Sequence, residues 1–375
     1  MINSRTGLLL GQCLFAAMVL IALPSSARAL EPELASSATA GVPGPHWFYV
    51  TDFSGIYIFD ADSGAMQGKL NGSSYSLSVA SDRARNEIYV PASFYTRRDY
   101  GERSDFIVVN DFENLAPVHE IKVPDKLAAI GPGNLGLLGG RFLAAYNLTP
   151  GMSVSIIDVQ ERKFVTEIST AGCAMVHPTV DGEFMQMCGD GTLQVITLDE
   201  SGNEAERRRS KRFFDIDEDP VMDYAVPSAD GWILVSYEGL IYQAAFAGGI
   251  EIGKPWSLLT EEDVEDGWRI GGDQPLAYNP ATGVLAVLMH KGEKDTHKDP
   301  GTELWVYDFA NRRRGYRLAL EAPVSAVEMT SANEPLLLLL GEGPVVAVHN
   351  ATTGRHIRTI KEAGISGWGL QRFWK

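Results

Sequence analysis

One phrase recurs along most of this chain, and it constrains the fold more than any other feature. A short apolar strand ends in Asp or Asn, a turn follows, and a charged strand comes next, as in IYIFDADSGAMQGKL at residues 56–70. Further copies lie at 105–123, 154–168, 193–206, 303–320 and 345–360, with a degenerate copy at 240–253. The copies recur roughly every 40 to 60 residues, and each can supply about four strands. This period predicts an all-β repeat fold.

The repeat favours one particular all-β architecture. A single four-stranded blade cannot bury both of its faces, so blades must stack around an axis and share a continuous core. We therefore predict a single seven-bladed β-propeller of four-stranded antiparallel blades over residues 46–375. Two β-sandwiches are the alternative, but they would not explain a single recurring phrase. The best helical segment, TEEDVEDGW at 260–268, falls in the longest interval, and we expect an inserted helical turn capped by Thr260.

The N-terminus has the features of an export signal. Arg5 precedes a long apolar stretch, and the small residues of the ARA sequence at 27–29 are suited to cleavage. We predict that residues 1–29 form a cleaved signal peptide rather than a membrane anchor. Residues 30–45 are rich in Ala, Ser, Gly and Pro without an apolar period, so we expect a flexible N-terminal arm.

The charge of the chain excludes one class of partner. The sequence contains 48 acidic residues against 32 Lys and Arg, and its formal net charge is −16. A chain this acidic repels phosphate backbones, so we do not expect it to bind nucleic acid. The acidity is compatible with a cationic ligand or partner.

Two cysteines lie beyond the predicted signal peptide, in the segment CAMVHPTVDGEFMQMC. A hairpin turn centred on Val180 and Asp181 would place Cys173 directly opposite Cys188. Cα atoms in such an antiparallel pair can lie about 4.5 Å apart, which a disulfide tolerates. A redox-active pair normally has closer sequence spacing, and an oxidising compartment preserves structural disulfides. We predict a structural disulfide that closes a loop of about 15 residues and stabilises the fold by about 3 kcal/mol.

Motifs for catalysis or metal binding are missing from the chain. The sequence contains no G-x-S-x-G, H-E-x-x-H or P-loop pattern, and no dinucleotide fingerprint follows a strand. The segment IGPGNLG at 130–136 has glycines but no following helical period, so we expect a loop there. His290 and His297 lie in the charged segment MHKGEKDTHKDPG, where we expect a solvated hairpin loop rather than a metal site. The segment FYTRRDYGERSD at 94–105 is either a long hairpin or a contact surface. The basic run at 206–212 is expected on a solvated outer strand.

These residues leave three functions open. The chain could be a non-catalytic propeller that binds a ligand or a protein partner. It could instead be an enzyme subunit whose chemistry is supplied by another chain. A metal-dependent propeller hydrolase, such as a lactonase, would need Glu, Asn and Asp side chains to converge on a central channel.

Several unusual strings point to one known family. They are RSDFIVVND, AGCAMVHPT…FMQMCGDGTL, RSKRFFDIDEDPV, KPWSLLTEEDVEDGWRIGG and MHKGEKDTHKDPGTELWVYD. Through these strings, and in matching order from about His46 to about Arg358, the chain resembles the heavy (propeller) subunit of the quinoprotein amine dehydrogenases. This family includes aromatic amine dehydrogenase and methylamine dehydrogenase.

The resemblance implies a periplasmic α2β2 enzyme. Such an enzyme oxidises a primary amine to an aldehyde and ammonia, and it passes electrons to a blue-copper protein such as amicyanin or azurin. The family cofactor, tryptophan tryptophylquinone, and the catalytic base belong to the separate light chain. The resemblance therefore implies that this chain holds no cofactor and no catalytic residue, and that it seats the light chain and walls the substrate channel.

The resemblance also implies roles for individual residues. In the family, a heavy-chain Phe near the start of the first blade lines the substrate channel. The matching segment here is TDFSGIYIFD, which gives this role to Phe53. Phe94 and Tyr95 are further candidates for the channel. The pair Cys173 and Cys188 matches a heavy-chain disulfide of the family.

Overall fold

The computed structural model describes residues 39–71, 73, 78–128, 131, 133–180 and 182–373. The chain divides into two units, Met1–Ser36 and Ser37–Lys375. The predicted signal peptide at 1–29, and most of the predicted arm at 30–45, lie outside the described residues. In the described part of the arm, Ala40 is buried and donates its backbone N–H to the carbonyl of Glu113. Among the described residues, no helix has the length and apolarity needed to cross a membrane.

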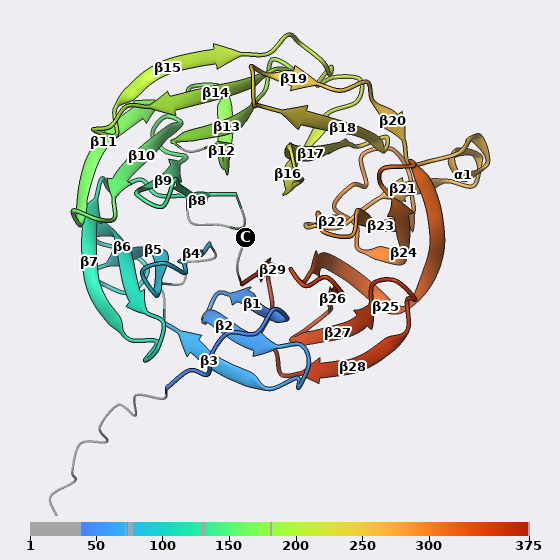
Figure 1. Cartoon of the computed structure of the whole chain (residues 1–375), viewed down its shortest axis with the longest axis horizontal. Coiled ribbons are helices and arrows are strands. Elements are labelled where there is room, and N and C mark those ends of the chain that lie inside the picture. Colours follow the sequence, from blue (N-terminus) through green and yellow to red (C-terminus); the bar gives the residue numbers. More distant parts are fainter. Residues whose placement is uncertain are drawn as a thin grey trace, which may run out of the picture. The chain divides into compact units, whose positions relative to one another are not determined.

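The unit Ser37–Lys375 is an all-β propeller of antiparallel sheets arranged around a common axis (Figure 1). Five sheets are separate blades. From the axis outward, the first blade contains β29 (Gly369–Arg372), β1 (Trp47–Asp52), β2 (Gly55–Asp60) and β3 (Met66–Leu70). The second contains β4 (Ala80–Asp82), β5 (Glu87–Tyr95), β6 (Arg103–Asp111) and β7 (Pro117–Val123), and the third contains β8 (Leu135–Leu138), β9 (Phe142–Asn147), β10 (Ser153–Asp158) and β11 (Lys163–Ser169).

The next two blades continue the same order. The fourth contains β12 (Cys173–Pro178), β13 (Glu183–Cys188), β14 (Leu193–Leu198) and β15 (Glu204–Arg209). The fifth contains β16 (Val221–Pro227), β17 (Gly231–Ser236), β18 (Leu240–Ala245), β19 (Glu251–Ile252) and β20 (Trp256–Ser257). The basic run at 206–212 begins on β15, an exposed outer strand, as the sequence predicted.

A single eight-stranded sheet completes the ring. It contains β21 (Trp268–Ile270), β22 (Leu276–Asn279), β23 (Val284–Lys291), β24 (Gly301–Asp308), β25 (Arg313–Met329), β26 (Leu336–Gly341), β27 (Val345–Asn350) and β28 (His356–Lys361). The prediction of seven separate blades is therefore wrong, because the described residues form five separate blades and this one joined sheet. The cause is the 17-residue strand β25, whose first half pairs with β24 and whose second half pairs with β26.

The two ends of the described propeller share one blade. The last strand, β29, pairs with the first, β1, so that Phe48 lies opposite Arg372. This pairing closes the ring, because a strand from the C-terminal end supplies the inner edge of the first blade. The pairing covers the inner edge of β1 and joins the first and last segments of the propeller in one sheet.

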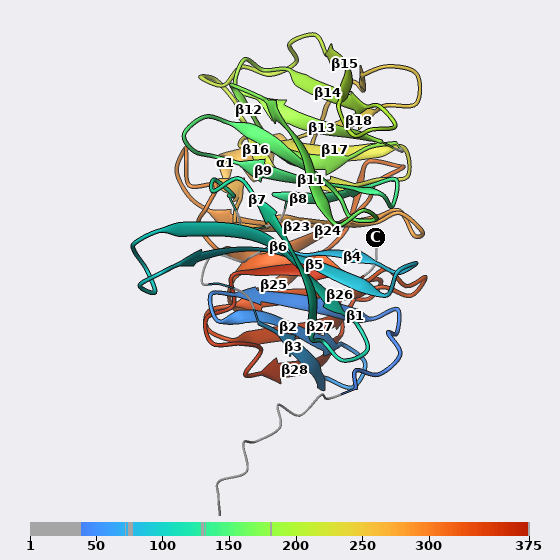
Figure 2. The ribbon, with the colours of Figure 1, turned by 90° about the vertical axis from the view of Figure 1, so that its left-hand side faces the viewer.

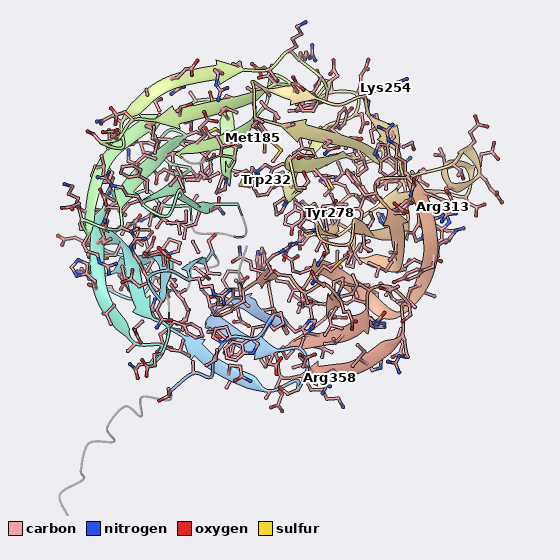
Figure 3. The ribbon with its side chains drawn as sticks, in the orientation of Figure 1. Met185, Trp232, Lys254, Tyr278, Arg313 and Arg358 are labelled. Atoms are coloured by element: carbon pink, nitrogen blue, oxygen red, sulfur yellow. A yellow bond between two sulfur atoms is a disulfide. The ribbon has the colours of Figure 1, made fainter. Side chains whose placement is uncertain are left out.

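The core lies between neighbouring sheets. Strands such as β9 and β10 are buried along their whole length, since a neighbouring sheet covers each of their faces. One apolar cluster joins Ile107 of the second blade to Leu143 and Ile157 of the third. Figure 3 shows the opposite character at the outer rim, where the charged side chains of Arg313 and Arg358 lie.

The predicted helical insertion is confirmed as α1 (Glu261–Glu265), which lies between β20 and β21. The side chain of Thr260 accepts a hydrogen bond from the backbone N–H of Asp263, and the Asp263 carboxylate accepts one from the backbone N–H of Thr260. This reciprocal capping box satisfies backbone donors that a five-residue helix cannot satisfy internally.

Candidate functional site

One end of the propeller carries the hairpins that join the second and third strands of the blades. The connections from each outer strand to the next inner strand lie at the same end, because four antiparallel strands alternate in direction. We call this end the hairpin face. Figure 2 shows the ring from the side, with α1 and the projecting β5–β6 hairpin on the same side of it.

Exposed apolar side chains gather on the hairpin face. Most of the large exposed apolar residues in the described part of the chain belong to its connections or strand ends: Phe53, Phe94, Tyr100, Leu148, Ile216, Val264, Ile365 and Trp368. Large apolar side chains that are exposed on one face are candidates for contact with a protein partner or a ligand. The hairpin face is therefore the candidate functional surface of this chain.

The predicted channel residue Phe53 lies at the tip of the β1–β2 hairpin. Its side chain is 43% exposed, and its ring makes an edge contact with Trp368 at 5.0 Å between ring centroids and 68° between planes. Trp368 is 41% exposed and Ile365 is 69% exposed, and both belong to the connection between β28 and β29. We call these three residues the Phe53 patch. Trp368 directly precedes β29, the innermost strand of its blade (Figure 1).

A buried carboxylate holds the two parts of the Phe53 patch together. Asp52 is only 1% exposed, and its Oδ2 accepts backbone hydrogen bonds from Ile365, Ser366 and Gly367 at 2.7, 2.6 and 3.1 Å. Its Oδ1 accepts hydrogen bonds from the backbone N–H and the hydroxyl of Ser54, both at 2.8 Å. The 362–368 connection is thus bound to the end of β1 through backbone donors.

These hydrogen bonds decide the charge state of Asp52. Burial by itself would raise the pKa of this carboxyl group. The backbone N–H groups of Ser366, Ser54 and Ile365, together with the Ser54 hydroxyl, outweigh burial and lower the pKa of Asp52 to about 2. The carboxylate is therefore ionised at neutral pH.

The other channel candidates lie on the neighbouring second blade. Phe94, near the end of β5, is 43% exposed, and its ring centroid lies 6.2 Å from that of Phe106. Tyr95 is half-buried and pairs in register with Arg103 on β6. The 94–105 segment forms a long hairpin that also exposes Tyr100, so it combines the two structures that the sequence left open.

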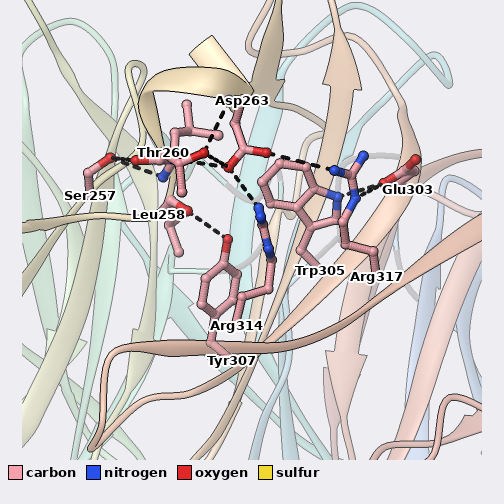
Figure 4. A network of polar contacts seen from close by, with 10 residues as sticks. Ser257, Leu258, Thr260, Asp263, Glu303, Trp305, Tyr307, Arg314 and Arg317 are labelled. Carbon is pink, nitrogen blue, oxygen red and sulfur yellow. Dashed lines mark hydrogen bonds and ion pairs between the residues drawn. The ribbon is translucent and has the colours of Figure 1, made fainter. Parts of the chain in front are cut away.

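A second buried carboxylate, Asp263, anchors α1 to the eight-stranded sheet (Figure 4). Its Oδ2 lies 2.8 Å from Nη1 of Arg314, and its Oδ1 lies 3.7 Å from Nη1 of Arg317. Both guanidinium groups lie 4.4 Å from the ring of the fully buried Trp305. Burial would raise the pKa of Asp263, but the Thr260 backbone and Arg314 hydrogen bonds lower it.

The histidine-containing segment forms the predicted hairpin loop between β23 and β24, but its two imidazoles are not solvent-exposed. His290 is buried, and its Nε2 lies 2.8 Å from Oγ1 of Thr296. His297 is half-buried and stacks on Tyr237 with 3.6 Å between ring centroids. Most residues between β23 and β24 are exposed, so the predicted solvated hairpin loop is confirmed except at its two imidazoles. The described residues contain no group of three or more His, Cys, Asp or Glu side chains that could hold a metal ion.

The predicted disulfide is present between Cys173 and Cys188, with 4.0 Å between their Cα atoms. The hairpin, however, differs in detail from the predicted turn. Near the turn, Pro178 lies opposite Phe184, so the pairing is shifted by one residue from the prediction. A bulge between Ala174 and His177 reverses this shift, and the cysteines pair as predicted. The bulge contains Met175 in a left-handed conformation, with φ of 68°.

The inner strands surround a cavity of about 440 Å³ near the axis, lined by Gly136, Pro178, Trp232 and Gln371 among others. A buried ion pair next to this cavity joins Glu328 Oε1 and Arg372 Nη2, which are 2.9 Å apart. These residues do not form the convergent set of Glu, Asn and Asp ligands that a metal-dependent hydrolase requires. The described residues therefore give no support to the hydrolase hypothesis.

Two residues of the hairpin face escaped the sequence analysis, Asp52 and Trp368. Asp52 and Ile365 are 313 residues apart in the sequence, so only the tertiary structure brings Asp52 to the 362–368 connection. Trp368 had a local signal, because it lies between Gly367 and Gly369 in a segment with no apolar period. A large aromatic residue in such a loop is a candidate contact residue.

Comparison with known proteins identifies a family. The family model described as methylamine dehydrogenase heavy chain (MADH) matches residues 40–368. The methylamine dehydrogenase heavy chain of Methylophilus methylotrophus is 26% identical over 328 residues, covering 85% of this chain and 80% of the relative. The corresponding protein of Methylobacillus flagellatus is 26% identical over 388 residues, covering 96% of this chain and 94% of the relative.

Solved structures support the fold alone. A protein of unknown function from Desulfotomaculum acetoxidans is similar with a TM-score of 0.59 and 10% identity, covering 87% of this chain and 98% of that one. Kluyveromyces lactis Hsv2 is similar with a TM-score of 0.54 and 12% identity, covering 87% of this chain and 94% of that one. The dihydro-heme d1 dehydrogenase NirN is similar with a TM-score of 0.54 and 15% identity, covering 90% of this chain and 77% of that one.

Proposed function

This chain belongs to the methylamine dehydrogenase heavy chain family and is the heavy subunit of an amine dehydrogenase, and we propose that the enzyme is a periplasmic α2β2 complex that depends on tryptophan tryptophylquinone. The complex oxidises primary amines to an aldehyde and ammonia, and it passes the electrons to a blue-copper protein such as amicyanin or azurin. The observation that carries this proposal is the family match over residues 40–368.

We propose that the light chain binds on the hairpin face. This face carries most of the exposed large apolar residues of the described chain, and such surfaces gain free energy when a partner removes them from water. The clamped helix α1 and the Asp52-bound connection give the face a defined shape before the partner arrives. A surface that is already ordered loses less conformational entropy when it binds.

In this proposal Phe53 forms part of the wall of the substrate channel. It is the exposed aromatic residue at the tip of the β1–β2 hairpin, and its ring contacts Trp368, which directly precedes the innermost strand β29. An apolar wall excludes water from the reacting amine, which protects the intermediates from hydrolysis and favours amines whose substituents fit the wall. Phe94 and Tyr95, on the adjacent blade, would contribute to the same wall or to its rim.

In this proposal the light chain contains the tryptophan tryptophylquinone cofactor, which would accept electrons from the amine. The described tryptophans of this chain fit structural roles better than cofactor roles. Trp268 and Trp305 lie 5.3 Å apart, but the guanidinium group of Arg317 lies over both rings. This chain would therefore bind and orient the light chain and exclude water, without a redox group of its own.

We further propose that the eight-stranded sheet acts as two blades. The strands β22 to β24 with the first half of β25 make one set of four, and the second half of β25 with β26 to β28 makes another. With the five separate blades, this division gives the sevenfold ring that the sequence repeat predicts.

The proposal is tested by expressing the chain together with a light chain and purifying the complex from the periplasm. We expect quinone absorbance, amine-dependent reduction of a redox dye and release of ammonia. A purified complex without quinone or light chain would contradict the enzyme proposal. It would favour the alternative, a non-catalytic periplasmic propeller that binds a ligand or a protein partner.

A first prediction concerns Phe53→Ala in the assembled enzyme. We expect the ratio of the kcat/KM values for a large and a small amine to change by about threefold to tenfold, because one wall of the channel is removed. The free energy of unfolding should change by less than about 1 kcal/mol, since the side chain is nearly half exposed. Val118→Ala, which removes an exposed apolar side chain on the outer strand β7, is the control. Unchanged amine preference in Phe53→Ala would contradict the channel role.

A further inference from the structure

We propose that Trp368 is a second specificity-determining residue, which forms with Phe53 an aromatic corner at the mouth of the substrate channel. This inference rests on the proposed function and deepens it. It names a residue of the C-terminal connection that the sequence did not assign, and it names the class of amine that this residue favours, namely arylalkylamines.

The geometry of the two rings supports a shared role. Phe53 belongs to the β1–β2 hairpin and Trp368 belongs to the connection before β29, yet their ring centroids lie 5.0 Å apart with 68° between planes. Each side chain is more than 40% exposed, with 43% for Phe53 and 41% for Trp368, so part of each ring surface remains free for a ligand. Two aromatic planes that meet at this angle form the two sides of a corner.

The backbone around Trp368 holds its ring in place. The Trp368 N–H donates to the carbonyl of Thr51 at 2.7 Å. The three preceding residues donate their N–H groups to the Asp52 carboxylate. Gly364 adopts φ of 110°, and a Cβ atom at this position would lie 2.8 Å from Oδ2 of Asp52, so the connection needs glycine there to approach the carboxylate. Asp52 is therefore a positioning residue for Trp368.

The chemistry of an aromatic corner favours a particular class of amine. A protonated amine is attracted to an aromatic face, and indole attracts cations more strongly than phenyl does. A methylammonium ion is small enough to contact one ring, whereas the aryl group of an arylalkylamine can contact both. Loss of Trp368 should therefore weaken the use of arylalkylamines more than the use of methylamine.

The test compares assembled wild-type enzyme with Trp368→Ala, Trp368→Phe, Phe53→Ala and the double variant, using 2-phenylethylamine and methylamine as probes. For Trp368→Ala we expect the ratio of kcat/KM for 2-phenylethylamine to kcat/KM for methylamine to fall by about threefold to tenfold. The kcat/KM for methylamine should fall less than that for 2-phenylethylamine, because a methylammonium ion contacts only one ring. Trp368→Phe, which keeps an aromatic ring, should retain most of the wild-type ratio.

The double variant tests whether the two rings act together. Residues in contact usually show non-additive effects, so the combined loss should be smaller than the product of the two single losses. Tyr100→Ala, which removes an exposed aromatic residue from the second blade, serves as the matched control and should combine additively with Phe53→Ala.

Several results would overturn the inference. An unchanged ratio in Trp368→Ala, or a loss shared equally by both amines, would refute a role in specificity. A Trp368→Phe enzyme that assembles normally but behaves like Trp368→Ala would also refute the aromatic corner. A wild-type complex with no activity toward any amine would instead refute the proposed function itself, so the two failures are distinguishable.

Discussion

Two buried carboxylates hold connections on the hairpin face, and they do so in different ways. Asp263 is 4% exposed and binds the side-chain cations Arg314 and Arg317 as well as the cap of α1. Asp52 is 1% exposed. It accepts hydrogen bonds from backbone N–H groups of the 362–368 connection and from the N–H and hydroxyl of Ser54 in the β1–β2 hairpin. Both arrangements lower the pKa of the carboxyl group, although burial opposes that change.

The surfaces beside the two carboxylates also differ. The ion pairs of Asp263 place two guanidinium groups beneath α1. The exposed residues of this helix include Glu261, Glu262 and Glu265. Among the described residues, Asp52 forms no ion pair, and the apolar Phe53 patch lies beside it. The surface next to Asp52 is therefore apolar, whereas α1 exposes three glutamates together with Val264.

Removing Asp263 should have the largest effect. In Asp263→Ala, two partly buried guanidinium groups lose their carboxylate and α1 loses its capping box, so we expect a loss of about 3 kcal/mol in the free energy of unfolding. Urea denaturation measures this loss. Glu265→Ala, on the exposed side of the same helix, is the control and should cost less than about 0.5 kcal/mol. A loss below 1 kcal/mol in Asp263→Ala would contradict the clamp.

Neutralising Asp52 should have a smaller, pH-dependent effect. The lowered pKa corresponds to about 2 kcal/mol of stability that is fully present above the ordinary carboxyl pKa of 3.8. This stability is lost as the pH falls through the native pKa of about 2. Asp52→Asn should therefore cost about 2 kcal/mol at pH 7, and its difference from wild type should shrink between pH 4 and 2.

Thermal unfolding of wild type and Asp52→Asn across this pH range checks the prediction. Hydrogen exchange at the backbone N–H groups of Ile365, Ser366 and Gly367 should become faster in the variant, because their acceptor is weakened. A stability difference that does not change with pH would show that the Asp52 charge does not contribute.

Added salt should have the smallest effect, and it distinguishes the ion pairs of Asp263 from the uncharged hydrogen bonds of Asp52. Raising the ionic strength from about 0.05 to 0.5 M screens charges that are partly open to solvent. The cost of Asp263→Ala should fall by a few tenths of a kcal/mol, since Arg314 and Arg317 are 28% and 35% exposed. The cost of Asp52→Asn should stay unchanged, because its partners carry no net charge. Equal salt dependence in both variants would remove the distinction between the two carboxylates.

Much of the fold was predictable because it depends on local patterns. The recurring strand–turn–strand phrase predicted four-stranded antiparallel blades, and the TEEDVEDGW segment predicted α1 and its Thr260 cap. The pairing of Cys173 with Cys188 was also predicted, although a longer turn and a bulge offset each other to produce it. Local periodicity and capping report on neighbours within a few residues, so one sequence is enough to find them.

The candidate site was harder to predict. The exposed position of Phe53 on the hairpin face agrees with the channel role that the resemblance implied, but that role stays a prediction. The solvated hairpin loop predicted around His290 and His297 is present, but the pattern of a charged loop does not show that Tyr237 of another hairpin covers one imidazole. The continuous strand β25 was missed because the sequence marks strands by composition and not by where pairing partners change.

The sequence by itself determined the repeating strands, the capped insertion and the cysteine pair, since each depends on residues close together along the chain. Only the tertiary structure decided which connections meet on the hairpin face. Ring closure brings the last connection against the first hairpin, where Asp52 ionises among backbone donors and Trp368 meets Phe53. The physical reason is that burial, hydrogen-bond partners and ring contacts between distant segments exist only after the blades have assembled around the axis.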